Sequence, residues 1–127
     1  MKDIALTQKM AIYNLAILMM SADGKIVNEE ILYFRKLKNI LELTDAECNA
    51  AASMTSADVV KIVQGLTAEN KVILLKLLTN MATIDGRFDT QEYQVIDRLM
   101  VLMDYQKVIS DLGGLDQIGN VAKPYQL

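Results

Sequence analysis

The sequence contains no histidine, and it has only one cysteine and one proline among its 127 residues. Histidine is the only side chain whose unperturbed pKa lies near 7, so its absence excludes most general-base schemes and the usual zinc sites. Cys48 has no second thiol to pair with, which excludes an intrachain disulfide and favours a reducing compartment, the cytoplasm. We expect this cysteine to be an ordinary packing residue. Pro124 is the single proline, so nothing interrupts helical hydrogen bonding before the last few residues.

The charge balance is slightly acidic, with 13 basic and 16 acidic residues and a net charge of −3. This balance disfavours attraction to nucleic-acid phosphate, so we expect no nucleic-acid partner. The apolar run from Met10 to Met20 is much shorter than the roughly 20 residues of a membrane span. Asp3 directly follows Lys2 and no small-residue cleavage site closes the run, so we expect neither membrane insertion nor a secretory signal. The length fits a single globular domain over residues 1–127.

Apolar positions recur at spacings of three and four, and β-branched residues are scattered instead of alternating. Helix-capping signals divide the chain: a capping box at Thr44 to Glu47, N-caps at Ser56 and Thr67, and a C-terminal stop at Gly65. These patterns predict an all-α fold. We expect about seven helices, over residues 4–22, 28–43, 45–54, 57–65, 68–84, 90–103 and 105–112.

The first and fifth of these helices are apolar nearly all round, which is typical of helices surrounded by others. We therefore expect them to form the centre of a compact bundle. The tail over residues 113–127 carries glycines and Pro124 with few apolar side chains, and we expect it to drape over the bundle or to be a flexible end.

A short acidic motif occurs twice, once in each half of the chain. Residues 23–30 align with residues 85–92, and both copies read Asp-Gly-basic-apolar-x-x-x-Glu. Each copy lies between a long apolar helix and an amphipathic one. The sequence therefore predicts an internal repeat of two αα-hairpins packed around a pseudo-two-fold axis.

The final glutamate of each motif lies on the apolar face of the helix that follows. Glu30 and Glu92 precede the apolar residues of their helices by four, seven and eleven positions: Phe34, Leu37 and Leu41 in the first copy, and Ile96, Leu99 and Met103 in the second. Both carboxylates should therefore face inward, where an unpaired charge costs several kcal/mol. The partner of each could be backbone N–H groups of its own helix, a basic side chain or a metal ion.

Each motif also fits the second half of a calcium EF-hand loop, but the first half does not fit. The opening position would be Met19 or Met81, so neither loop alone could hold calcium tightly. Any cation should therefore lie between the two copies, with oxygen ligands that select Ca²⁺, Mg²⁺ or Mn²⁺ over a soft metal. The expected ligands are Asp23, Glu30, Asp85, Asp89 and Glu92.

The two motifs, SADGKI with Glu30 and TIDGRF with Glu92, resemble those of the TerB-like tellurite-resistance family over residues 9–104. The resemblance implies an all-helical TerB-like domain, and a related domain occurs at the N-terminus of membrane-anchored DnaJ-like co-chaperones. Some family members bind divalent cations at the acidic cluster, which implies Asp23, Glu30, Asp85 and Glu92 here. It also implies a non-enzymatic module of stress response or protein interaction, with an unknown protein partner and an oligomeric state that the sequence leaves open.

Two other functions fit the same residues. In a metal-free interaction scaffold, Asp23 and Asp85 brace their turns, while Glu30 and Glu92 act only as capping-box glutamates, the second in a box that opens at Asp89. In an acid hydrolase, paired carboxylates would do the chemistry, but the sequence supplies neither a nucleophile nor a phosphate-binding loop. We therefore expect the protein not to be an enzyme.

Overall fold

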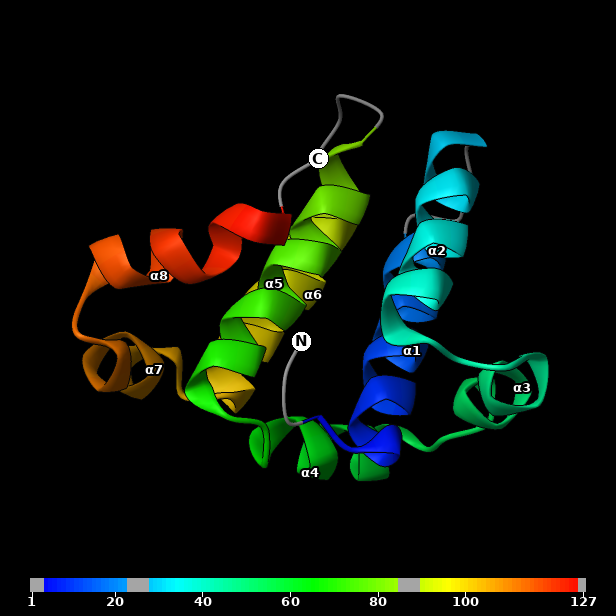
Figure 1. Cartoon of the computed structure of the whole chain (residues 1–127), viewed down its shortest axis with the longest axis horizontal. Coiled ribbons are helices and arrows are strands. Elements are labelled where there is room, and N and C mark those ends of the chain that lie inside the picture. Colours follow the sequence, from blue (N-terminus) through cyan, green and yellow to red (C-terminus); the bar gives the residue numbers. More distant parts are fainter. Residues whose placement is uncertain (1–3, 23–27, 85–89, 126–127) are drawn as a thin grey trace.

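The computed structural model describes residues 4–22, 28–84 and 90–125. Within these ranges the chain forms eight α-helices and a short 3₁₀-helix, and no strand occurs in them (Figure 1). The helices are α1 Leu6–Ser21, α2 Asn28–Leu41, α3 Asp45–Ala52, α4 Ser56–Gln64, α5 Ala68–Thr83, α6 Thr90–Leu102, α7 Tyr105–Leu112, α8 Leu115–Ala122 and η1 Lys123–Tyr125. The all-α prediction is confirmed, with one helix more than the seven expected.

Two helix starts follow the predicted capping signals. The Thr44 hydroxyl accepts a hydrogen bond from the Glu47 N–H at 3.2 Å, and the Glu47 carboxylate accepts one from the Thr44 N–H at 2.9 Å, which completes the capping box of α3. The Thr67 hydroxyl accepts from the Asn70 N–H at 3.1 Å and starts α5. These bonds satisfy N–H groups that the first turn of a helix would otherwise leave without partners.

Other boundaries differ slightly from the prediction. Thr55, and not Ser56, caps α4, because its hydroxyl accepts from the Asp58 N–H at 3.2 Å. Glu42 and Asp104 follow the ends of α2 and α6 with left-handed backbone, at φ 55° and 51°, so both helices end slightly earlier than predicted. These two are the only non-glycine residues with positive φ in the described part of the chain.

The C-terminal segment contains the helix that the sequence does not predict. Its glycines and Pro124 argue against a helix, yet Leu115–Ala122 form α8. Gly113 and Gly114 have φ of 91° and 120°, a conformation that glycine adopts without strain, and they turn the chain from α7 into α8. Helix α8 then lies against α5.

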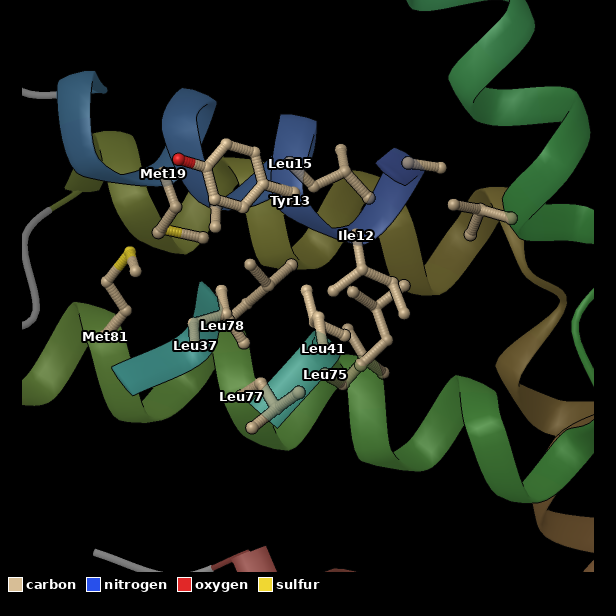
Figure 2. Packing of buried hydrophobic residues seen from close by; sticks show 14 of the residues in the cluster. Ile12, Tyr13, Leu15, Met19, Leu37, Leu41, Leu75, Leu77, Leu78 and Met81 are labelled. Carbon is tan, nitrogen blue, oxygen red and sulfur yellow. The ribbon is translucent and has the colours of Figure 1, made fainter. Parts of the chain in front are cut away.

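The helices α1 and α5 form the centre of the bundle, as their apolar sequences predict. Helix α1 contacts α2, α3, α4 and α5, and α5 also contacts α2, α6, α7 and α8. Their innermost side chains are almost completely buried: Ala11, Ile12, Ala16 and Met19 on α1, and Leu74, Leu77, Leu78 and Met81 on α5. Figure 2 shows Met19 and Met81 directed toward one another across the core. Complete burial of one such large side chain stabilises the fold by about 1.5–3 kcal/mol.

Helices α1 and α3 meet around Tyr13 and Cys48, both of which are buried. The burial predicted for the single cysteine as a packing residue is confirmed. The Tyr13 ring also packs against Phe34 of α2, with ring centroids 4.7 Å apart. Burial, and then a hydrogen bond with Cys48, raise the pKa of Tyr13 to about 12.

Because α1 and α5 run in the same direction, their C-terminal ends and the N-terminal ends of α2 and α6 all lie at one end of the bundle (Figures 1 and 2). We call this the motif end, defined by the last turns of α1 and α5 and the first turns of α2 and α6. The second acidic motif follows the first by a fixed number of residues along the chain. Helix α5 begins and ends that same number of residues after α1, and α6 begins that same number of residues after α2. The left-handed residues Glu42 and Asp104 are related by the same offset.

Candidate functional site

Two of the predicted site residues, Glu30 and Glu92, are buried at the motif end. Glu30 is 4% exposed and Glu92 is 5% exposed. Each is the third residue of its helix, since α2 begins at Asn28 and α6 at Thr90. The inward direction that the helical spacing predicts is confirmed by this burial. A buried carboxylate requires a partner, and neither glutamate lacks one.

The other three predicted ligands, Asp23, Asp85 and Asp89, lie outside the described residues. The capping box predicted to open at Asp89 is therefore also outside them. Within residues 4–22, 28–84 and 90–125, no group of three or more cysteine, aspartate and glutamate side chains could hold a metal ion. The five-residue site stays a prediction, of which the structure places two members.

Helix α3 shows how a glutamate in this helical position behaves when it acts as a cap. Glu47 is also the third residue of its helix, and its carboxylate accepts the Thr44 N–H at 2.9 Å, but it is only half-buried. Exposed N–H groups and the helix dipole favour a carboxylate in the first turn of any helix. Glu30 and Glu92 are much more buried than Glu47. Capping a helix therefore does not require a glutamate to be buried as deeply as these two are.

The donor set suits a hard divalent cation. Carboxylate oxygens are the ligands that Ca²⁺, Mg²⁺ and Mn²⁺ prefer, and the first turns of α2 and α6 each present one buried carboxylate. Glu30 and Glu92 therefore fit such an ion as members of a larger set of ligands.

A hydrogen-bonded network that the sequence does not predict lies beside the motif end. Asn80, in the last turn of α5, is 4% exposed. Its side-chain amide donates to the Tyr33 hydroxyl of α2 at 3.1 Å and to the Tyr125 carbonyl of η1 at 2.6 Å. Burial raises the pKa of Tyr33 above its ordinary value, although the hydrogen bond from Asn80 acts in the opposite direction. The network joins α2, α5 and the C-terminal segment.

In the sequence, the only indication of this network is that Asn80 is an amide within a largely apolar stretch of α5. Asn14 is likewise an amide within a largely apolar stretch of α1, and its role is similar. Its side-chain amide donates to the carbonyls of Ala51 at 2.9 Å and Met54 at 3.4 Å. In both cases the amide donates to at least one backbone carbonyl of a distant segment. Neither asparagine is among the residues predicted for the site.

No helix in the described part of the chain is both long enough and apolar enough to cross a membrane. Comparison with known protein families gives a match to the profile described as "Tellurite resistance protein TerB" over residues 9–108. This range contains both acidic motifs and extends from α1 into α7. No curated protein and no solved structure matches the chain.

Proposed function

The chain belongs to the TerB tellurite-resistance family, and from that membership we propose that it is a non-enzymatic module that binds a divalent cation at the motif end. It acts in the cytoplasm, in a stress response or in protein interaction. The ion is Ca²⁺, Mg²⁺ or Mn²⁺, and the ligands are Asp23, Glu30, Asp85, Asp89 and Glu92. The observation that supports this proposal is the burial of two carboxylates at one end of the bundle, in the first turns of the helices that contain the ends of the two motifs.

In this proposal both hairpins contribute ligands, so the bound cation links them. Glu30 holds the ion from α2 and Glu92 holds it from α6. Because the ion offsets the charge of carboxylates that are already desolvated, its binding free energy adds to the stability of the arrangement of α2 and α6. Occupancy of the site would then control how firmly the motif end is held for a protein partner.

An amide-shift titration of ¹⁵N-labelled protein with Mg²⁺, Ca²⁺, Mn²⁺ and Zn²⁺ tests the proposal. We expect saturable amide shifts in residues 23–30 and 85–92 with Ca²⁺ and Mg²⁺, saturable line broadening there with paramagnetic Mn²⁺, and the loss of both in Asp23→Asn and Asp85→Asn, which remove charge and keep shape. Asp58→Asn and Asp116→Asn are the matched controls, because these exposed carboxylates lie in the first turns of other helices, α4 and α8. Silence toward every ion, or loss of the response in the controls as well, would contradict the proposal.

A metal-free interaction scaffold is the second candidate, and the third-residue position of both glutamates favours it, since this is where a capping glutamate lies. Glu30→Gln separates the two functions. Glutamine also serves in a capping box, so a purely capping role predicts little change in stability. A ligand role predicts at least a tenfold loss of cation affinity in the same variant, because a charged ligand is removed.

A further inference from the structure

An open groove of about 450 Å³ lies between α1, α4 and α6. Its size is within the range of natural binding pockets. Most of its described lining is apolar, and the apolar side chains come from all three helices: Leu15 and Leu18 of α1, Val59 and Val60 of α4, and Val95, Leu99 and Leu102 of α6. Leu18 is 48% exposed in spite of its size. A ligand that covers it therefore removes apolar surface from water.

The polar side chains of the groove are concentrated on α6. Gln91, Gln94 and Arg98 are exposed and recur at steps of three and four, so they form one edge of the groove. From the first to the last of them the helix rises about 10 Å. In the part of the lining that the structure describes, Arg98 is the only charged residue, and no ion pair of Arg98 is found among the described residues.

We propose that this groove binds an amphipathic helix of another protein, which places apolar side chains on the floor and acidic side chains against the α6 edge. A helix bound in a groove presents its apolar anchors at positions i, i+3, i+4 and i+7. The apolar floor would hold these anchors, and the polar α6 edge, which has a comparable length, would contact the polar flank of the bound helix. The acidic flank supplies the charge complementary to Arg98. The proposal goes beyond the cation site and uses none of its predicted ligands.

Two other occupants fit less well. An amphiphile with one polar end requires polar groups at one end of a pocket, whereas here three of the five polar lining residues run along the α6 edge, and the other two, Asn14 and Ser56, belong to α1 and α4. A second copy of the chain in a two-fold contact centred on Arg98 would set this arginine against its own counterpart, and like charges in contact are repulsive. A helix with an acidic flank has neither difficulty.

The test uses two synthetic amphipathic peptides, each long enough for several helical turns, with leucine at the i, i+3, i+4 and i+7 positions. One carries glutamates along the flank of the leucine stripe, and the other carries lysines at the same positions. Binding is measured by fluorescence anisotropy without added cation, and amide shifts map the contact. We expect saturable binding of the glutamate peptide, shifts in the groove residues of α1, α4 and α6, and about 1.5- to fivefold weaker binding of the lysine peptide. This ratio follows from the loss of one exposed ion pair, with Arg98, worth about 0.2–1 kcal/mol.

Charge reversal and its control make the test specific. Arg98→Glu should reverse the preference between the two peptides, whereas Arg35→Glu, an exposed arginine on α2 outside the groove, should leave it unchanged. Leu18→Glu should weaken binding about tenfold, as is common for a central apolar contact, and Leu32→Glu, an exposed leucine on α2, should not.

Four results of the binding measurements would overturn the proposal. They are the absence of binding of both peptides at millimolar concentration, shifts outside the groove, equal binding by the wild type and Arg98→Glu, and tighter binding of dodecanoate than of the peptide in the same groove. Sedimentation that shows self-association, lost in Leu18→Glu, would assign the groove to a second copy and would also overturn it. Because no cation is added, failure here is distinguishable from failure of the cation site.

Discussion

Tyr13 is one of the tyrosines whose burial makes the stability of the bundle fall at alkaline pH. Its pKa in the native protein is about 12, because of burial and then the hydrogen bond with Cys48, while the unfolded chain ionises near the ordinary value of 10.0. Below pH 10 both states keep the proton and the contribution to stability is complete. Between pH 10 and 12 only the unfolded state ionises, so this contribution is lost, by up to about 2–3 kcal/mol.

Urea unfolding of the wild type and of Tyr13→Phe, from about pH 8 to about pH 12, measures this loss. We expect the free energy of unfolding of the variant to fall less steeply above pH 10, because phenylalanine does not titrate. Parallel curves for the wild type and Tyr13→Phe would show that this hydroxyl is not the source of the pH dependence.

Asn80 holds two distant segments with one side chain. In Asn80→Ala the Tyr33 hydroxyl and the Tyr125 carbonyl both lose this donor, and a buried polar group without a partner costs about 1–3 kcal/mol. We expect a decrease in the free energy of unfolding in that range, measured by chemical denaturation. Asn49→Ala, at an exposed position on α3, serves as the control and should change stability by less than about 0.5 kcal/mol.

These residues also mark what a sequence can predict at this scale. The burial of Glu30 and Glu92 is predictable, because helical spacing places each on the apolar stripe of its own helix. The contacts of Asn80 are not predictable, because its partners are 47 and 45 residues away in the chain and meet it only through tertiary packing. The proposed ligands outside the described residues stay predictions.

At the scale of elements, α8 is the helix that the sequence does not predict. Its contribution to the stability of the fold can be tested by deletion. Deletion of residues 113–127 removes a helix that lies against α5 and the Tyr125 carbonyl that Asn80 contacts. We expect the shortened protein to remain helical by circular dichroism, with a free energy of unfolding lower by a few kcal/mol, because the apolar contacts of Val121 and Tyr125 with the core are lost. An unchanged free energy of unfolding would show that α8 contributes nothing to the fold.

A point variant keeps the chain length constant. Val121→Asp introduces a charge on the face of α8 that packs toward the core and should reproduce part of the loss, whereas Asn120→Asp, at an exposed neighbouring position, should not.

Helices with a strong local signal are the ones that the sequence predicts well. Helix α7 is predicted over residues 105–112 and is found at Tyr105–Leu112, and α5 differs by one residue at its end. The exceptions have local physical causes. Two adjacent hydroxyl residues compete to cap α4, and the glycines that indicate a break act instead as the turn that starts α8.

At the scale of the whole molecule, cation binding should stabilise the fold. An ion that binds only the native state at 100 times its dissociation constant adds about 2.7 kcal/mol, which raises the melting temperature of a domain of this size by several degrees. We expect this increase with Ca²⁺, Mg²⁺ or Mn²⁺ in thermal unfolding, its reversal by a chelator, and its absence in Asp85→Asn. A melting temperature that is independent of these ions in the wild type would contradict a native cation site.

The arrangement of the two motifs is a property of the whole chain. Each hairpin reverses direction once, and α3 and α4 carry the chain to the start of α5 away from the motif end (Figure 1). Helix α5 therefore runs in the same direction as α1, which brings Glu30 and Glu92 to the same end. The sequence predicts the two hairpins, but their common direction depends on the path of this connection, which no local pattern specifies.

The position of the only thiol provides a natural reporter of local opening. Cys48 is 8% exposed and lies where α3 meets α1, so a bulky reagent reaches its sulfur atom only after α3 moves away from α1. When opening is rapid and reversible, the rate of alkylation in the native protein, divided by the rate in denaturant, gives the equilibrium constant for that movement. The unmodified chain thus reports the free energy needed to release one helix, without an engineered label.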